Sequence, residues 1–177
     1  TSADGDLYLN ASTDLAVGGN LNITATTGNI TQGAAATVTG TSTFTTMEVN
    51  ADIDLATNGT SNALGGVVTL TTSGTGGDAT LDNGTTKLDM AASSVGGNLS
   101  LRTGHALGII NTSGTVAVGG TLTLVTDNNS GVINMPNLAV TGSVDLATHG
   151  SGNATLVNTG ALEFAASEVG GDLDATA

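Results

Sequence analysis

Residues 17–23 read Val-Gly-Gly-Asn-Leu-Asn-Ile, and the same seven-residue pattern, apolar-x-Gly-x-apolar-x-apolar, returns along the whole chain. We call this pattern the repeat phrase. The intervals between its copies are 21, 26, 31, 23, 22 and 29 residues, and self-similarity at this period is typical of a solenoid. The seven copies begin at Val17, Val38, Leu64, Val95, Val118, Val140 and Val169.

Within each copy the hydrophobic period is two residues. Val95, Leu99 and Leu101 share one parity, while Asn98 and Ser100 between them are polar. This alternation indicates a half-buried β-strand and not a helix. The residues expected to point inward on this basis are Val17, Leu21, Ile23, Val95, Leu99, Leu101, Val118, Leu122, Leu124, Val140, Val144 and Leu146.

Each unit contains two further strand-like pieces, separated by Gly, Asn, Ser and Thr, which favour turns. Three strands and three corners make one rung of a coil. The sequence therefore predicts an all-β fold: a single right-handed parallel β-helix of roughly seven rungs of about 21–31 residues, with three strands per rung. Rungs paired at about 4.8 Å would give a rod of about 34 Å.

A longer repeat is also visible, because "KLDMAASSVGGNL" at 87–99 returns as "ALEFAASEVGGDL" at 161–173. The predicted organisation is one continuous segment over 1–177, an excerpt of a longer array. Its expected parts are a partial rung (1–16), a first three-rung repeat (17–94), a second (95–168) and the start of another rung (169–177).

Composition narrows the functional classes. The formal net charge is −13, and Lys87 and Arg102 are the only basic side chains, so nucleic-acid binding and a polybasic membrane anchor are not expected. The chain has no cysteine and no apolar run long enough to span a bilayer, so neither disulfides nor membrane insertion are expected.

The wording of residues 17–46 and 88–101 resembles the repeats of large filamentous-haemagglutinin-like adhesins, exoproteins of two-partner secretion. The resemblance extends over nearly the whole chain and includes the grouping of rungs in threes. It implies a long parallel β-helix that is exported with the help of an outer-membrane secretion partner and exposed on the bacterial cell surface. It implies no catalytic residue and no particular receptor.

Three groups of residues are candidates for catalysis or metal binding. Enzymes on this fold need clustered carboxylates with basic residues, and Lys87 and Arg102 fall in different rungs. His105, Asp127 and His149 fall on one expected corner in three consecutive rungs, where solvated turns are favoured over Zn²⁺ binding. The stretch "GTGGDATLD" at 74–82 does not have the spacing of a calcium loop, although Asp and Asn could bind counter-ions loosely.

Surface columns were also compared between copies. Thr-x-Thr occurs at Thr41/Thr43 and Thr121/Thr123, but other copies carry Asn, Ser or Asp there, which breaks an ice-binding array. Alignment of the last two copies predicts that Asp145 and Asp174 are stacked neighbours about 5 Å apart.

The sequence therefore favours a non-enzymatic structural module: a stalk segment of a secreted, extracellular adhesin that mediates cell–cell or cell–matrix attachment, as in a biofilm. No catalytic, cofactor-binding or metal-binding residue is assigned. Expected partners are extracellular polysaccharide or surface receptors of neighbouring cells. The alternative is a polysaccharide-binding β-helix module or, less favoured, a polysaccharide-degrading enzyme, and the near absence of aromatic residues argues against both.

Overall fold

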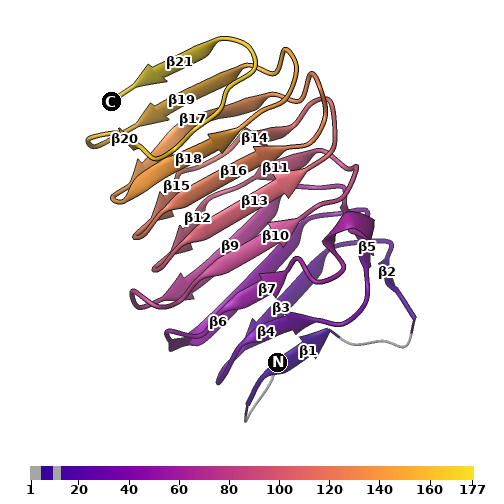
Figure 1. Cartoon of the computed structure of the whole chain (residues 1–177). Coiled ribbons are helices and arrows are strands. Elements are labelled where there is room, and N and C mark those ends of the chain that lie inside the picture. Colours follow the sequence, from indigo (N-terminus) through magenta and orange to yellow (C-terminus); the bar gives the residue numbers. More distant parts are fainter. Residues whose placement is uncertain (1–4, 10–12) are drawn as a thin grey trace.

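The computed structural model describes residues 5–9 and 13–177, and they form a parallel β-solenoid (Figure 1). Strands stack from the N-terminal end to the C-terminal end, and every strand pairing is parallel. No α-helix occurs among the described residues; a single 3-10 turn, Gly59–Ser61, interrupts one rung. The predicted fold class is confirmed.

Sheet 1 contains one strand from each rung and therefore counts the rungs, of which the described residues form eight. Its inward column begins at Leu7 and passes through Ile30 and Ile53. Its strands are β1 (Leu7–Leu9), β4 (Ile30–Gln32), β7 (Ile53–Leu55), β10 (Ala79–Asp82), β13 (Leu99–Thr103), β16 (Leu122–Thr126), β18 (Ser143–Ala147) and β20 (Glu163–Phe164).

Sheets 2 and 3 form the remaining sides. Sheet 3 is short and comprises β2 (Leu15–Val17), β5 (Ala36–Val38) and β8 (Ala63–Leu64). Sheet 2 has ten strands: β3 (Leu21–Ala25), β6 (Ser42–Val49), β9 (Val68–Ser73), β11 (Leu88–Met90), β12 (Ser93–Val95), β14 (Ile109–Asn111), β15 (Val116–Val118), β17 (Ile133–Val140), β19 (Ala154–Asn158) and β21 (Leu173–Thr176).

The core is a set of aliphatic columns that run along the rod. In sheet 1, Leu99 pairs in register with Leu122, and Leu122 with Val144, and all three are fully buried. The expected inward residues all belong to the core or pack against it. Val17, Leu21 and Ile23 are only partly buried because the rung that contains them has a described neighbour on one side only. The inward assignment is confirmed.

The number of copies of the repeat phrase differs from the number of rungs, because successive copies do not always lead into the same sheet. The copy at Val95 leads into β13 of sheet 1, whereas the copies at Val17 and Val169 lead into β3 and β21 of sheet 2. Two intervals between copies, 31 and 29 residues, therefore cover a full rung and part of the next. This is why seven copies correspond to eight rungs.

The same shift makes the predicted stacking of Asp145 on Asp174 wrong. Asp145 pairs with Thr123 in sheet 1, whereas Asp174 pairs with Thr155 in sheet 2. The two carboxylates lie in columns of different sheets, because the final copy of the phrase begins one side later in the coil.

The register gives a direct test of the core. Leu101→Asp should lower the free energy of unfolding by several kcal/mol, because an unpaired carboxylate would enter an aliphatic column. Ser100→Asp should change it by no more than about 0.5 kcal/mol, since Ser100 lies outward between Thr80 and Thr123. Urea denaturation followed by circular dichroism measures both, and equal losses would mean a register error of one residue.

Candidate functional site

The most regular polar feature is a ladder of side chains along the corner that precedes sheet 1. We call it the corner ladder. At each step a side-chain oxygen of one rung accepts a hydrogen bond from the backbone N–H of the equivalent residue in the next rung. The bonds are Asn29 N to Asp6 Oδ1 (2.7 Å), Asp52 N to Asn29 Oδ1 (2.7 Å), Asp78 N to Asp52 Oδ1 (2.9 Å), Asn98 N to Asp78 Oδ1 (2.7 Å) and Thr121 N to Asn98 Oδ1 (2.9 Å).

The corner ladder supplies hydrogen-bond acceptors to backbone groups where the strands end. A corner has no strand partner, so its N–H groups need another acceptor if they are not to remain unpaired. Carboxylates make stronger acceptors than neutral amides. Asp52 and Asp78 are adjacent in the ladder, whereas Asn29 separates Asp6 from Asp52 and Asn98 follows Asp78. This interleaving limits the number of carboxylates that stack directly.

The corner ladder also explains why the repeat phrase contains glycine. A Cβ on Gly97 would clash with Asp78 Oδ1 of the preceding rung, and a Cβ on Gly120 would clash with Asn98 Oδ1. None of the phrase glycines has a positive φ. From Gly40 onward, all of them except Gly65 lie where a Cβ would come within 3 Å of the preceding rung, so they are needed for close approach between rungs.

A threonine eight residues after the start of most phrases fixes the next corner. The hydroxyl of Thr46 donates to the carbonyl of Ala51, that of Thr126 to Gly131, and that of Thr148 to Gly152. Each bond joins the threonine to a residue four or five positions later. These buried hydroxyls therefore hold tight loops closed without a helix or a disulfide.

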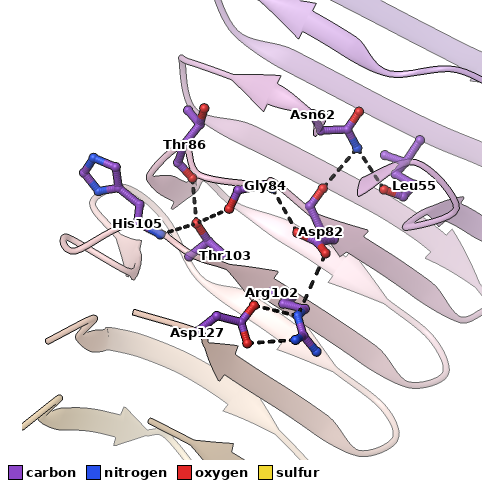
Figure 2. A network of polar contacts seen from close by, with 9 residues as sticks. All are labelled: Leu55, Asn62, Asp82, Gly84, Thr86, Arg102, Thr103, His105 and Asp127. Atoms are coloured by element: carbon purple, nitrogen blue, oxygen red, sulfur yellow. Dashed lines mark hydrogen bonds and ion pairs between the residues drawn. The ribbon is translucent and has the colours of Figure 1, made fainter. Parts of the chain in front are cut away.

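Outside the corner ladder, Arg102 forms ion pairs with two aspartates, shown in Figure 2. Its Nε and Nη2 donate to the two carboxylate oxygens of Asp127, both at 2.8 Å, and its Nε lies 3.9 Å from Asp82 Oδ2. The Arg102 side chain is 51% exposed and that of Asp127 is 38% exposed, so the pair contributes about 0–1 kcal/mol to stability. Lys87 pairs separately with Asp89 at 3.3 Å.

Beside this ion pair lies a shallow depression. Its volume is about 190 Å³, below the 300–1,000 Å³ that is usual for small-molecule sites. Asp82 accepts a hydrogen bond from Gly84 N, and both carboxylate oxygens of Asp127 accept hydrogen bonds from Arg102. The charged groups of the depression therefore already have partners within the chain. The lining residues are Thr60, Asp82, Gly84, Thr85, Gly104 and Asp127.

His105, Asp127 and His149 follow β13, β16 and β18 of three consecutive rungs, as expected, but they do not form a metal centre. His105 Nδ1 accepts a hydrogen bond from Leu107 N, His149 Nδ1 contacts the carbonyl of Thr126 at 2.7 Å, and Asp127 is held by Arg102. Over residues 5–9 and 13–177, no group of three or more His, Cys, Asp or Glu side chains could hold a metal ion.

The stretch 74–82, considered for calcium, and the threonine pairs, considered for ice binding, also take part in contacts within the coil. Within the stretch 74–82, Asp78 belongs to the corner ladder and Asp82 binds Gly84 N. Threonine pairs do stack in register, but elsewhere than expected: Thr43 and Thr45 of β6 lie beside Thr69 and Thr71 of β9. Complete pairs occur in two rungs; in the rung before them Thr24 continues one column and Asn22 the other.

The sequence reading missed the corner ladder, although a signal for it exists. In the first five rungs an Asp or Asn stands immediately before an apolar-x-apolar or similar strand, as in Asp6-Leu7 and Asn29-Ile30. The repeat phrase includes only some of these positions.

The geometry thus defines a repetitive β-solenoid whose polar groups mainly hold the coil together. The chain belongs to a family of repeats of unknown function (DUF5649), whose model matches residues 1–71 and again 76–147. No curated protein and no solved structure matches the chain significantly. Nothing in the described residues forms a helix of the length and hydrophobicity that a membrane crossing requires.

The glycine requirement can be tested by substitution. Gly97→Ala should lower the free energy of unfolding by about 1–3 kcal/mol, because its Cβ would overlap Asp78 Oδ1 and the carbonyl of Gly77. Gly104→Ala in the same rung is the control. The nearest atom to its Cβ would be 3.4 Å away, so its effect should be small. Thermal unfolding of both variants decides the matter, and similar losses would contradict the close-approach argument.

The corner ladder has its own test. Asp78→Ala removes the acceptor of Asn98 N and should cost about 1 kcal/mol of stability. Asp78→Asn keeps a side-chain oxygen and should retain most of it. Asp145→Ala, which removes a carboxylate outside the corner ladder, should have little effect. Chemical denaturation at one ionic strength compares the three, and an Asn variant as unstable as the Ala variant would assign the effect to charge and not to the hydrogen bond.

Proposed function

We propose that the chain is a structural stalk segment of a secreted, cell-surface bacterial adhesin that mediates cell–cell or cell–matrix attachment, as in a biofilm. In this proposal the parent protein is filamentous-haemagglutinin-like and leaves the cell by two-partner secretion. The segment supplies length and stiffness, and the receptor is bound elsewhere. The resemblance of the repeat sequence to the repeats of those adhesins supports this part of the proposal.

The observation that carries the proposal is the continuous core along the rod. The inward residues of each rung are covered by the rungs on either side, as Leu122 is by Leu99 and Val144. A structure of this kind grows by adding rungs, without a larger globular core. The two successive matches to one family model support repetition as the means of lengthening.

Features of the surface support a role without catalysis or a cofactor. The depression near Arg102 is small, and its charged groups already have partners. An aromatic platform for stacking sugars is also missing from the described chain: Phe44 is fully buried, while Tyr8 and Phe164 lie in the first and last strands of sheet 1. Polysaccharide or receptors of neighbouring cells remain the proposed partners of the parent adhesin.

The proposed role predicts how the length of the rod increases with the number of repeat copies. Proteins with two, four and six tandem copies of residues 95–168 should form rods of constant width. Leu21 and Leu173 hold the same place two copies apart and are separated by seven rungs, so each copy adds about 3.5 rungs and the length should rise by about 17 Å per copy. Small-angle scattering measures length and cross-section together. Particles that widen instead, or lengths that stop increasing after two copies, would contradict the stalk proposal.

A second experiment separates the stalk from a binding module. On an array of bacterial and host glycans, the 177-residue chain should bind no glycan saturably and release no reducing ends from any. Saturable binding to one polysaccharide class, with the fold intact, would favour the polysaccharide-binding alternative. Release of reducing ends would favour an enzyme.

A further inference from the structure

The structure contains the same junction twice, on two different sides of the coil. At the first junction, β9 is followed in the next rung by two short strands, with Val68 paired to Met90 and Thr71 to Ser94. At the second, β18 is followed in the same way. There Val144 pairs with Phe164, and Ala147 bridges to Glu168.

Side-chain hydrogen bonds repeat at both junctions. Leu70 N donates to Ser93 Oγ at 3.1 Å, and Leu146 N donates to Ser167 Oγ at 3.1 Å. Two threonine hydroxyls also accept from the glycine that follows each short strand. These bonds are Gly96 N to Thr72 Oγ1 (3.1 Å) and Gly170 N to Thr148 Oγ1 (2.9 Å).

At each junction an asparagine side chain hydrogen-bonds to both the backbone N–H and the backbone C=O of one residue in the preceding rung, as a paired strand would. Asn83 Oδ1 accepts from Leu64 N, and Asn83 Nδ2 donates to Leu64 O. Asn158 makes the same two bonds with Val140. At the first junction this arrangement ends sheet 3, whose last strand, β8, contains Leu64. The amide side chain therefore occupies the edge where a further strand would have paired.

The equivalent residues of the two repeats lie in different sheets. The column that starts at Leu21 passes through Ser42 and Val68 to Met90, all in sheet 2, and nine residues later the chain reaches Leu99 in sheet 1. The column that starts at Leu99 passes through Leu122 and Val144 to Phe164, all in sheet 1. Nine residues later the chain reaches Leu173 in sheet 2.

We infer that the repeat of this family is not a whole number of rungs: it is three rungs plus a nine-residue step, and successive copies present equivalent surfaces on alternate sides of the rod. Leu21 and Leu173 hold the same place in their copies, and both lie in sheet 2. The column of Leu173 contains Leu88, two residues before Met90 in the column of Leu21. Every second copy thus returns to nearly the same side.

This alternation fixes how a surface carried by every repeat would be displayed. Leu21 and Leu173 are seven rungs apart, or about 34 Å along the axis. Equivalent positions of every second repeat therefore recur along one side of the rod at about this interval. The equivalent position of the repeat between them, Leu99, lies in sheet 1 on another side of the rod.

Cysteine pairs labelled with pyrene test the inference, because the chain contains no natural cysteine. Thr155→Cys with Asp174→Cys should give excimer emission, since these outward residues pair in adjacent strands. Asp145→Cys with Asp174→Cys should give monomer emission only, because the two lie in different sheets. Thr123→Cys with Asp145→Cys is the matched positive control.

Repeats of a whole number of rungs would give the opposite result for the two test pairs. Excimer emission from Asp145→Cys with Asp174→Cys, or its absence from Thr155→Cys with Asp174→Cys while the control emits, would overturn the inference. Single-cysteine variants at the same concentration exclude emission between molecules, and circular dichroism checks the fold of each variant. This measurement reads geometry alone, so its outcome is independent of the adhesin proposal.

Discussion

Close approach between successive rungs at the corners is the constraint on which the rest of the structure depends. Adjacent strands must lie about 4.8 Å apart, and the chain must keep that spacing where no strand pairing exists. Asp78 and its equivalents bridge the gap with a side-chain oxygen, and Gly97 leaves room for that oxygen in the next rung. The Gly and the Asp or Asn of the sequence are thus two parts of one contact. The buried aliphatic columns can form because the corners keep the same spacing between rungs as the strands do.

The charge of the chain follows from this construction as much as from its environment. Several of the carboxylates are structural acceptors at corners: Asp6, Asp52 and Asp78 bind backbone N–H groups of the next rung, and Asp82 binds Gly84 N. With so few basic residues, few of these charges are neutralised within the chain. The rod therefore remains strongly acidic, which disfavours nonspecific association with other acidic surfaces.

The two-residue periodicity was sufficient to predict the solenoid and the inward side of each strand, because burial depends on parity within one strand. It was not sufficient to align rungs, because the Gly-Gly corner moves from one side of the coil to another. Val95 and Val169 open nearly identical phrases, yet they lead into different sheets. The Asp or Asn before each of the first five strands of sheet 1, as at Asp52 and Asp78, would have aligned those five rungs directly. Which glycines need space and not a positive φ depends on the neighbouring rung, which local sequence does not reveal.

The most direct measurement of the account is the detection of scalar couplings across the ladder hydrogen bonds in an isotopically labelled chain. We expect a coupling between the Asn98 amide nitrogen and the side-chain carboxyl carbon of Asp78. We expect a second between the Thr121 amide nitrogen and the side-chain carbonyl carbon of Asn98. Couplings from these amides to backbone carbonyl carbons, or rapid exchange of both amides with solvent, would contradict the claim that side chains hold successive rungs together at this corner.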